Sequence, residues 1–177
     1  MMHNSSRNYF ELFNLPTRFS IDLSALDQQY RKLQSAVHPD RFATAPAAER
    51  LHSIQLATQT NEAYRTLKDP TARARYLLQI NGVDTEEESN TAMPAEFLVL
   101  QMEWREAIED ARAARDIPAL DQLLHAMQQE SNTLQQRLHL TLDEKKAYPE
   151  AAETVRKLRF LDKVRDDIQQ SISRLED

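Results

Sequence analysis

Apolar residues recur every three or four positions along most of this chain, which is the spacing of a helix with one buried face. The first clear run has the apolar members Leu23, Leu26, Tyr30, Leu33 and Val37. Asp22 precedes it and is placed to cap the first turn, and Pro39 ends it because proline has no amide hydrogen. A second run has the members Leu51, Ile54, Ala57, Asn61, Tyr64 and Leu67. The two runs predict a pair of antiparallel helices.

Shorter helical signals flank this pair. A short helix is expected from Asn8 to Leu15, where Pro16 ends it. Another is expected to start at Asp69-Pro70, a capping carboxylate followed by proline in the first turn. Gly82 stands just past the end of that helix, where a left-handed C-cap favours glycine.

The second half of the chain predicts three long amphipathic helices, which open at Pro94, Pro118 and Pro149. Each carries one narrow apolar stripe, and short connections between long helices are typical of a three-helix bundle. The predicted fold class is therefore all-α, with a helical hairpin and two short helices joined to a C-terminal bundle.

Four apolar residues lie off these stripes. With Phe97 set at zero, Leu98, Met102 and Val99 fall at about 100°, 140° and 200° around their helix. Phe160 lies about 100° from the middle of the stripe on the last helix. One interpretation is scattered surface residues, which are common. The other is one exposed patch, rimmed by acidic residues such as Glu103 and Glu106, that binds a protein.

The distribution of charged residues divides the chain at the same place as the predicted helical groups. Residues 1–80 carry 10 basic and 7 acidic residues, whereas residues 81–177 carry 12 basic and 21 acidic ones. An acidic polar stretch separates the two parts and has the composition of a linker. We therefore expect a domain at 1–82, an acidic linker at 83–93 and a three-helix bundle at 94–177. The acidic bundle disfavours nucleic-acid binding.

Composition excludes several kinds of chemistry. The chain has one glycine and no cysteine, so glycine-rich phosphate loops, thiol nucleophiles and cysteine metal sites are ruled out. Its five histidines show no metal-ligand spacing, and no serine nucleophile motif is present. We expect no cofactor, no metal and no enzymatic activity. No signal-peptide pattern or membrane-length apolar run appears, so we expect a cytoplasmic protein that does not bind membranes.

The tripeptide His38-Pro39-Asp40 lies between the two antiparallel helices and contains more polar residues than the end of a helix requires. Proline alone would end the helix, so the flanking histidine and aspartate are additional. They could be a cap and a cation at a helix C-terminus. Arg31 and Lys32 precede them on the first helix of the pair.

In this setting the first eighty residues resemble the J domain, with which co-chaperones stimulate DnaK-type chaperones. The matching segments are Tyr9-Phe10-Glu11-Leu12, Tyr30-Arg31-Lys32-Leu33, His38-Pro39-Asp40, Asn61-Glu62-Ala63-Tyr64 and Arg73-Ala74-Arg75-Tyr76. The rest of the chain resembles the HscB family of iron–sulfur co-chaperones. The strongest matches there are Phe97-Leu98, Glu103-Trp104-Arg105-Glu106 and Thr154 to Lys163.

The resemblance implies two partners. The J domain would dock on the chaperone HscA through His38, Pro39 and Asp40, with Arg31 and Lys32 on the docking helix. The bundle would hold the scaffold protein IscU, and the resemblance places its contact surface at Leu98, Val99, Met102, Glu103, Glu106 and Phe160. We expect a monomer that delivers the scaffold to HscA and so promotes cluster transfer. Two alternatives stay open: a general J-domain co-chaperone that recruits clients to DnaK, and a structural helical adaptor.

Overall fold

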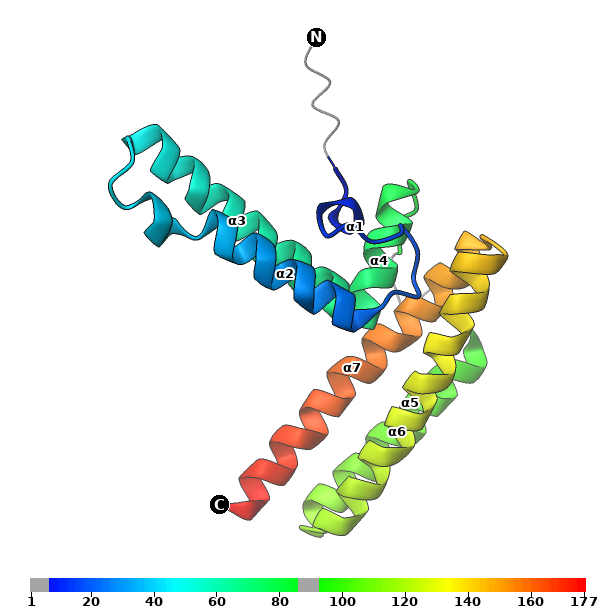
Figure 1. The fold of residues 1–177 in the computed structure, drawn as a ribbon. Coiled ribbons are helices and arrows are strands. Elements are labelled where there is room, and N and C mark those ends of the chain that lie inside the picture. Colours follow the sequence, from blue (N-terminus) through cyan, green and yellow to red (C-terminus); the bar gives the residue numbers. More distant parts are fainter. Residues whose placement is uncertain (1–6, 86–92) are drawn as a thin grey trace. The chain divides into compact units, whose positions relative to one another are not determined.

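Figure 1 shows the fold in a computed structural model, which describes residues 7–85 and 93–177. Every regular element in these two ranges is helical, so the predicted all-α class is confirmed. The chain divides into two compact units, one ending at Leu77 and one starting at Leu78. The predicted domain bounds at 82 and 94 stay a prediction. Residues 86–92 of the predicted linker lie outside the described residues.

The first unit is built on a helical hairpin. Its helices are α1 (Tyr9–Leu12), α2 (Leu23–Val37), α3 (Ala47–Lys68) and most of α4 (Pro70–Ile80), whose last residues belong to the second unit. A 3-10 turn, η1 (Pro39–Phe42), lies between α2 and α3. Helices α2 and α3 lie antiparallel and side by side (Figure 1). Asp22 accepts a hydrogen bond from the amide of Ala25 at 3.2 Å, and Asp69 accepts one from Ala72 at 2.9 Å. Both predicted caps are therefore present.

Two side chains of α4 hold the N-terminal segment of this unit. The hydroxyl of Tyr76 accepts a hydrogen bond from the amide of Tyr9 at 2.9 Å, and the two rings stack with centroids 4.4 Å apart. The buried guanidinium of Arg73 donates to the carbonyl oxygens of Phe19 at 2.8 Å and Leu67 at 2.7 Å. These bonds join three segments that are distant in sequence.

The predicted buried face of α3 is wrong near the tip of the hairpin. Leu51 is 57% exposed and Ile54 is 49% exposed, although both belong to the apolar run read from the sequence. The residues that α3 buries are Ser53, Thr60, Ala63 and Leu67. Three of these four side chains are small, which lets two helices approach closely. The buried face of α3 is therefore set by its packing against α1, α2 and η1 rather than by its largest apolar residues.

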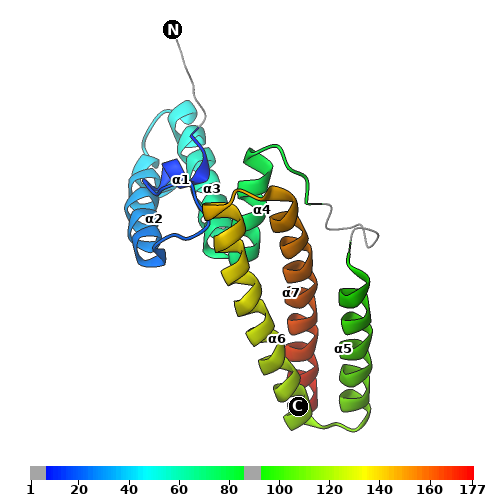
Figure 2. The same cartoon turned by 90° about the vertical axis from the view of Figure 1, so that its right-hand side faces the viewer.

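The second unit contains the predicted three-helix bundle, formed by α5 (Ala95–Ala113), α6 (Ile117–Leu138) and α7 (Tyr148–Glu176). Figure 2 shows these helices running alongside one another. Their buried residues include Leu120 and Met127 of α6 and Leu158 and Leu161 of α7, spaced seven and three residues apart as on one helical stripe. A π-helical turn, η3 (His139–Glu144), joins α6 to the segment before α7 and was not predicted. Gly82 has φ of 76°, the left-handed conformation expected after the end of α4.

Candidate functional site

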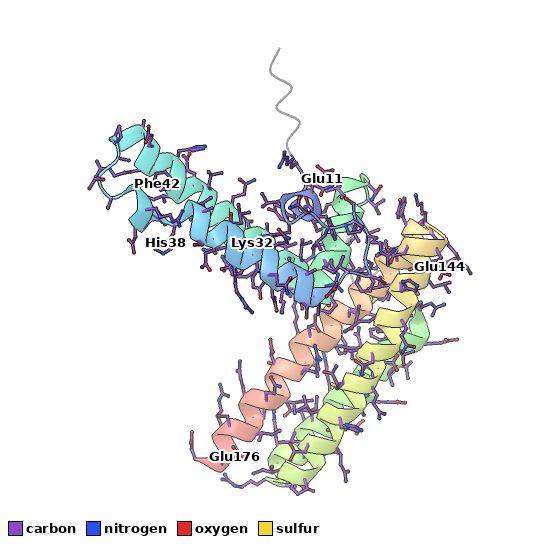
Figure 3. All side chains as sticks on the ribbon, viewed as in Figure 1. Glu11, Lys32, His38, Phe42, Glu144 and Glu176 are labelled. Carbon is purple, nitrogen blue, oxygen red and sulfur yellow. The ribbon has the colours of Figure 1, made fainter. Side chains whose placement is uncertain are left out.

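The tip of the α2–α3 hairpin carries the motif His38-Pro39-Asp40. Helix α2 ends at Val37, His38 takes an extended conformation, and Pro39 opens the turn η1. Figure 3 shows His38 and Phe42 at this tip and Lys32 further back along α2. The proline ends one helix and starts the next turn, so the chain changes direction within three residues.

The motif presents an exposed carboxylate on a fixed turn. The His38 ring nitrogen Nδ1 accepts a hydrogen bond from the backbone N–H of Asp40 at 3.2 Å, so the histidine caps η1. The Asp40 carboxylate oxygen Oδ2 lies 3.6 Å from the same nitrogen, and its side chain is 94% exposed. Asp40 therefore contributes little to the packing of the hairpin. Its carboxylate is available to a basic group of a partner protein.

Arg31 and Lys32 are exposed on α2, about two helical turns before His38. They add positive charge to the helix that leads to the acidic tip. The arrangement therefore presents both negative and positive side chains at the surface of the hairpin.

A polar network fixes α2 against α3 behind the tip. The Tyr30 and Tyr64 rings stack with centroids 3.9 Å apart, and the Tyr64 hydroxyl donates to Asp27 at 2.7 Å. Lys68 donates to the same carboxylate at 2.9 Å. The hydrogen bond from Lys68, together with that from Tyr64, lowers the pKa of Asp27 below its usual value. The same bonds raise the pKa of Lys68 and of Tyr64. This network holds α2 and α3 together toward the end of the hairpin opposite the tip.

An apolar cavity of about 370 Å³ adjoins the tip and was not predicted from the sequence. Val37, Phe42 and Leu56 supply most of its apolar lining, from α2, η1 and α3. The cavity forms only where three segments meet, and the apolar periodicity of a single helix does not show how these segments are placed.

The predicted patch on the bundle is partly as expected. Val99 is 55% exposed and Met102 is 70% exposed, while Leu98 is half-buried. Glu103 and Glu106 are exposed on the same helix, α5. An apolar surface with acidic neighbours is therefore present on α5.

Phe160 is less of a surface residue than its helical angle indicates. Its ring is half-buried and stacks on Trp104, with centroids 6.2 Å apart and planes 16° apart. It also meets the Phe97 ring edge-on at 5.7 Å, and the Arg105 guanidinium lies 5.6 Å from its centroid. Phe160 thus joins α7 to α5 and has a structural role in addition to any role in binding.

The described residues of the two units were compared with what a metal site and a membrane span require. No group of three histidine or acidic side chains in residues 7–85 and 93–177 is arranged to hold a metal ion. Within the same ranges, no helix combines the length and the apolar character that crossing a membrane requires.

Comparison with known proteins agrees with this division. Residues 8–76 match the DnaJ domain family, and residues 93–169 match the family described as the HSCB C-terminal oligomerisation domain. The Burkholderia multivorans protein named co-chaperone protein HscB homolog is 50% identical over 169 residues, or 96% of each chain. The chain belongs to the HscB family of co-chaperones.

Solved HscB structures share the whole fold. The chaperone HscB from Vibrio cholerae has a TM-score of 0.85 and 38% identity, covering 96% of this chain and 99% of that one. The human co-chaperone HscB has a TM-score of 0.89 and 27% identity, covering 94% and 83%. The predicted HscB family and the predicted fold, a J domain followed by a helical bundle, are confirmed. The assignments of individual site residues stay predictions.

Proposed function

We propose that this HscB-family co-chaperone stimulates the ATPase of the DnaK-type chaperone HscA and delivers the iron–sulfur scaffold protein IscU to it. The observation that carries the proposal is the Asp40 carboxylate, held on a turn that His38 caps and left almost fully exposed. A J domain with such a tip is suited to bind a basic site on its chaperone.

The tip would act through one charged contact. Asp40 accepts charge-assisted hydrogen bonds from a basic group of HscA, while His38 and Pro39 fix the direction of the turn. Arg31 and Lys32 contact acidic groups of the same partner along α2. Such charge pairs contribute both to the rate of association and to its specificity.

The bundle would bind IscU through Leu98, Val99, Met102 and Phe160. Apolar anchors near the centre of an interface commonly contribute about 2 kcal/mol or more each. Glu103 and Glu106 lie beside these anchors and bind basic groups of the scaffold. In the complex, IscU is brought to HscA as a client, and cluster transfer to acceptor proteins follows.

The chain itself would carry out no covalent step. Its role requires no cofactor and no metal of its own, and the iron–sulfur cluster is cargo held by IscU. We place the protein in the cytoplasm as a monomer, without a nucleic-acid or membrane partner.

Steady-state ATP hydrolysis by HscA tests the proposal, measured with the full chain alone, with IscU alone and with both. We expect the chain to stimulate hydrolysis, and we expect the chain and IscU together to exceed the sum of their separate effects. A parallel series with DnaK in place of HscA should show weak stimulation and no synergy with IscU.

Each outcome of this experiment distinguishes the candidates. Equal stimulation of DnaK and HscA, without IscU synergy, identifies a general J-domain co-chaperone instead. Absence of stimulation with both chaperones identifies a structural adaptor and removes the proposed function of the tip.

A further inference from the structure

A groove lies between α5 and α7 on the bundle, beginning at Phe160. It encloses a cavity of about 380 Å³ with an apolar floor that includes the buried side chains of Ile108 and Val164. Its walls carry the basic residues Arg105 and Arg112 from α5 and Lys163 from α7.

The groove continues toward the end of α7. A second cavity of about 280 Å³ shares Arg112 and Asp167 with the first and adds Arg174 and Leu175 to the lining. The two cavities therefore form one channel along both helices. On α7, Phe160, Lys163, Asp167 and Arg174 are spaced three, four and seven residues apart, which keeps them on one face.

The lining is basic although the bundle is acidic. Four basic side chains line the two cavities, Arg105, Arg112, Lys163 and Arg174, against two acidic ones, Glu109 and Asp167. Arg112 donates to Glu109 at 2.8 Å and to the Ser171 hydroxyl at 2.7 Å. Lys163 and Arg174 are exposed. The excess positive charge attracts a negatively charged ligand, and the apolar floor favours one that carries aliphatic groups as well.

The groove is continuous with the apolar patch on α5. Counted at 100° per residue, Leu98, Met102, Arg105, Glu109 and Arg112 fall within a sector of about 80° on this helix. Leu98 and Met102 of the patch therefore occupy the first half of this face and the groove residues the second half, while Val99 lies about 100° from Leu98, beside the face. Phe160 lines the groove and is also a predicted member of the patch.

We propose that the groove receives an acidic segment of the same scaffold protein that covers the patch, an inference that rests on the proposed function. A free anion would use the charges but not the apolar floor, whereas an extended acidic peptide uses both along the length of the channel. Glu103 and Glu106 lie on other parts of α5, so the surface has an acidic side and a basic side. This polarity fixes the orientation of the bound scaffold as well as its affinity.

Calorimetric titration of the full chain with apo IscU tests the inference, at several salt concentrations. The test variant is the double charge reversal Lys163→Glu/Arg174→Glu, because both side chains are exposed. The matched control is Arg137→Glu/Lys145→Glu, which changes the net charge equally at exposed positions outside both cavities. A third variant, Met102→Asp, disrupts the patch.

We expect the groove variant to bind IscU about tenfold or more weakly at low salt, with a smaller dependence on salt than the parent. The control should bind within about twofold of the parent. Thermal melts of all variants should coincide with that of the parent within a few degrees, because no buried side chain is changed.

The remaining outcomes separate the inference from the proposed function. Parent-like binding by the groove variant, together with loss of binding by Met102→Asp, overturns the groove but leaves the patch. Equal weakening of the groove variant and the control also overturns it, because the effect is then one of overall charge. Parent-like binding by both the groove variant and Met102→Asp, or no binding of IscU by the parent, overturns the proposed function of the bundle.

Discussion

The two surfaces proposed for recognition, the hairpin tip and the bundle face, present different kinds of residues. At the tip, the Asp40 side chain is 94% exposed and makes no contribution to a core. On the bundle, Phe160 is half-buried between Phe97, Trp104 and Arg105. A substitution at the tip is therefore expected to change binding without changing stability, whereas a substitution of Phe160 is expected to change both. A loss of activity has a different meaning in the two regions, and stability must be measured beside binding on the bundle.

The largest effect is expected at the tip, where Asp40→Asn removes the exposed negative charge. Loss of a charged pair in an interface costs about 2–5 kcal/mol, so stimulation of HscA should fall by more than about tenfold. The melting temperature should stay within about 2 °C of the parent, because the side chain packs against nothing buried. Glu62→Gln, an equal change at an exposed position on α3, is the control and should stimulate normally. Normal stimulation by Asp40→Asn would show that the tip is not the docking site.

A pair of alanine variants separates folding from binding on the bundle. Phe160→Ala removes two ring contacts and one cation–π contact. It should lower the free energy of unfolding by about 2 kcal/mol, which is less than the cost for a fully buried phenylalanine. Met102→Ala should cost less than about 0.5 kcal/mol, since its side chain is 70% exposed. Both should weaken IscU binding by about tenfold or more.

Denaturant unfolding and calorimetric titration of these two variants give the required measurements. A normal unfolding free energy for Phe160→Ala would contradict the coupling between the patch and the core. Normal IscU binding by both variants would place the scaffold on another surface.

The smallest effect is expected in the polar network behind the tip. The pKa of Asp27 is lowered in the folded state, chiefly by its hydrogen bond from Lys68, so the network stabilises the fold above the unfolded pKa of about 3.9. That contribution is lost as the pH falls below this value and through the lower folded pKa. Asp27→Asn should therefore lower the melting temperature at pH 7 by less than about 5 °C and reduce its change between pH 5 and pH 2. An unchanged acid dependence in circular dichroism melts would contradict this role.

Short sequence patterns predicted where helices begin more reliably than which face of a helix is buried. Asp22 and Asp69 were recognised as caps because a capping carboxylate and its amide lie three residues apart in the sequence. The face of α3 was predicted wrongly because α3 buries Ser53, Thr60 and Ala63 where it packs among α1, α2 and η1. A single apolar pattern contains no information on which partner helix comes closest.

The candidate sites show the same difference. The motif His38-Pro39-Asp40 was visible as three adjacent residues, and Val99 and Met102 were visible from the phase of one helix. The aromatic contacts of Phe160 and the basic groove depend on how α5 and α7 pack together. Arg105, Arg112, Lys163 and Arg174 are spread over seventy residues, and only the bundle brings them to one channel.

The stacking of Trp104 on Phe160 has a spectroscopic consequence. Trp104 is the single tryptophan of the chain, so it dominates the intrinsic fluorescence when excited near the red edge of the absorption band. Its ring is half-buried on the helix that carries the proposed scaffold surface, and a protein that covers this surface removes water from around the indole. The emission maximum then moves to shorter wavelength, whereas a ligand confined to the hairpin tip leaves it in place. The bundle thus contains a label-free reporter of its own occupancy.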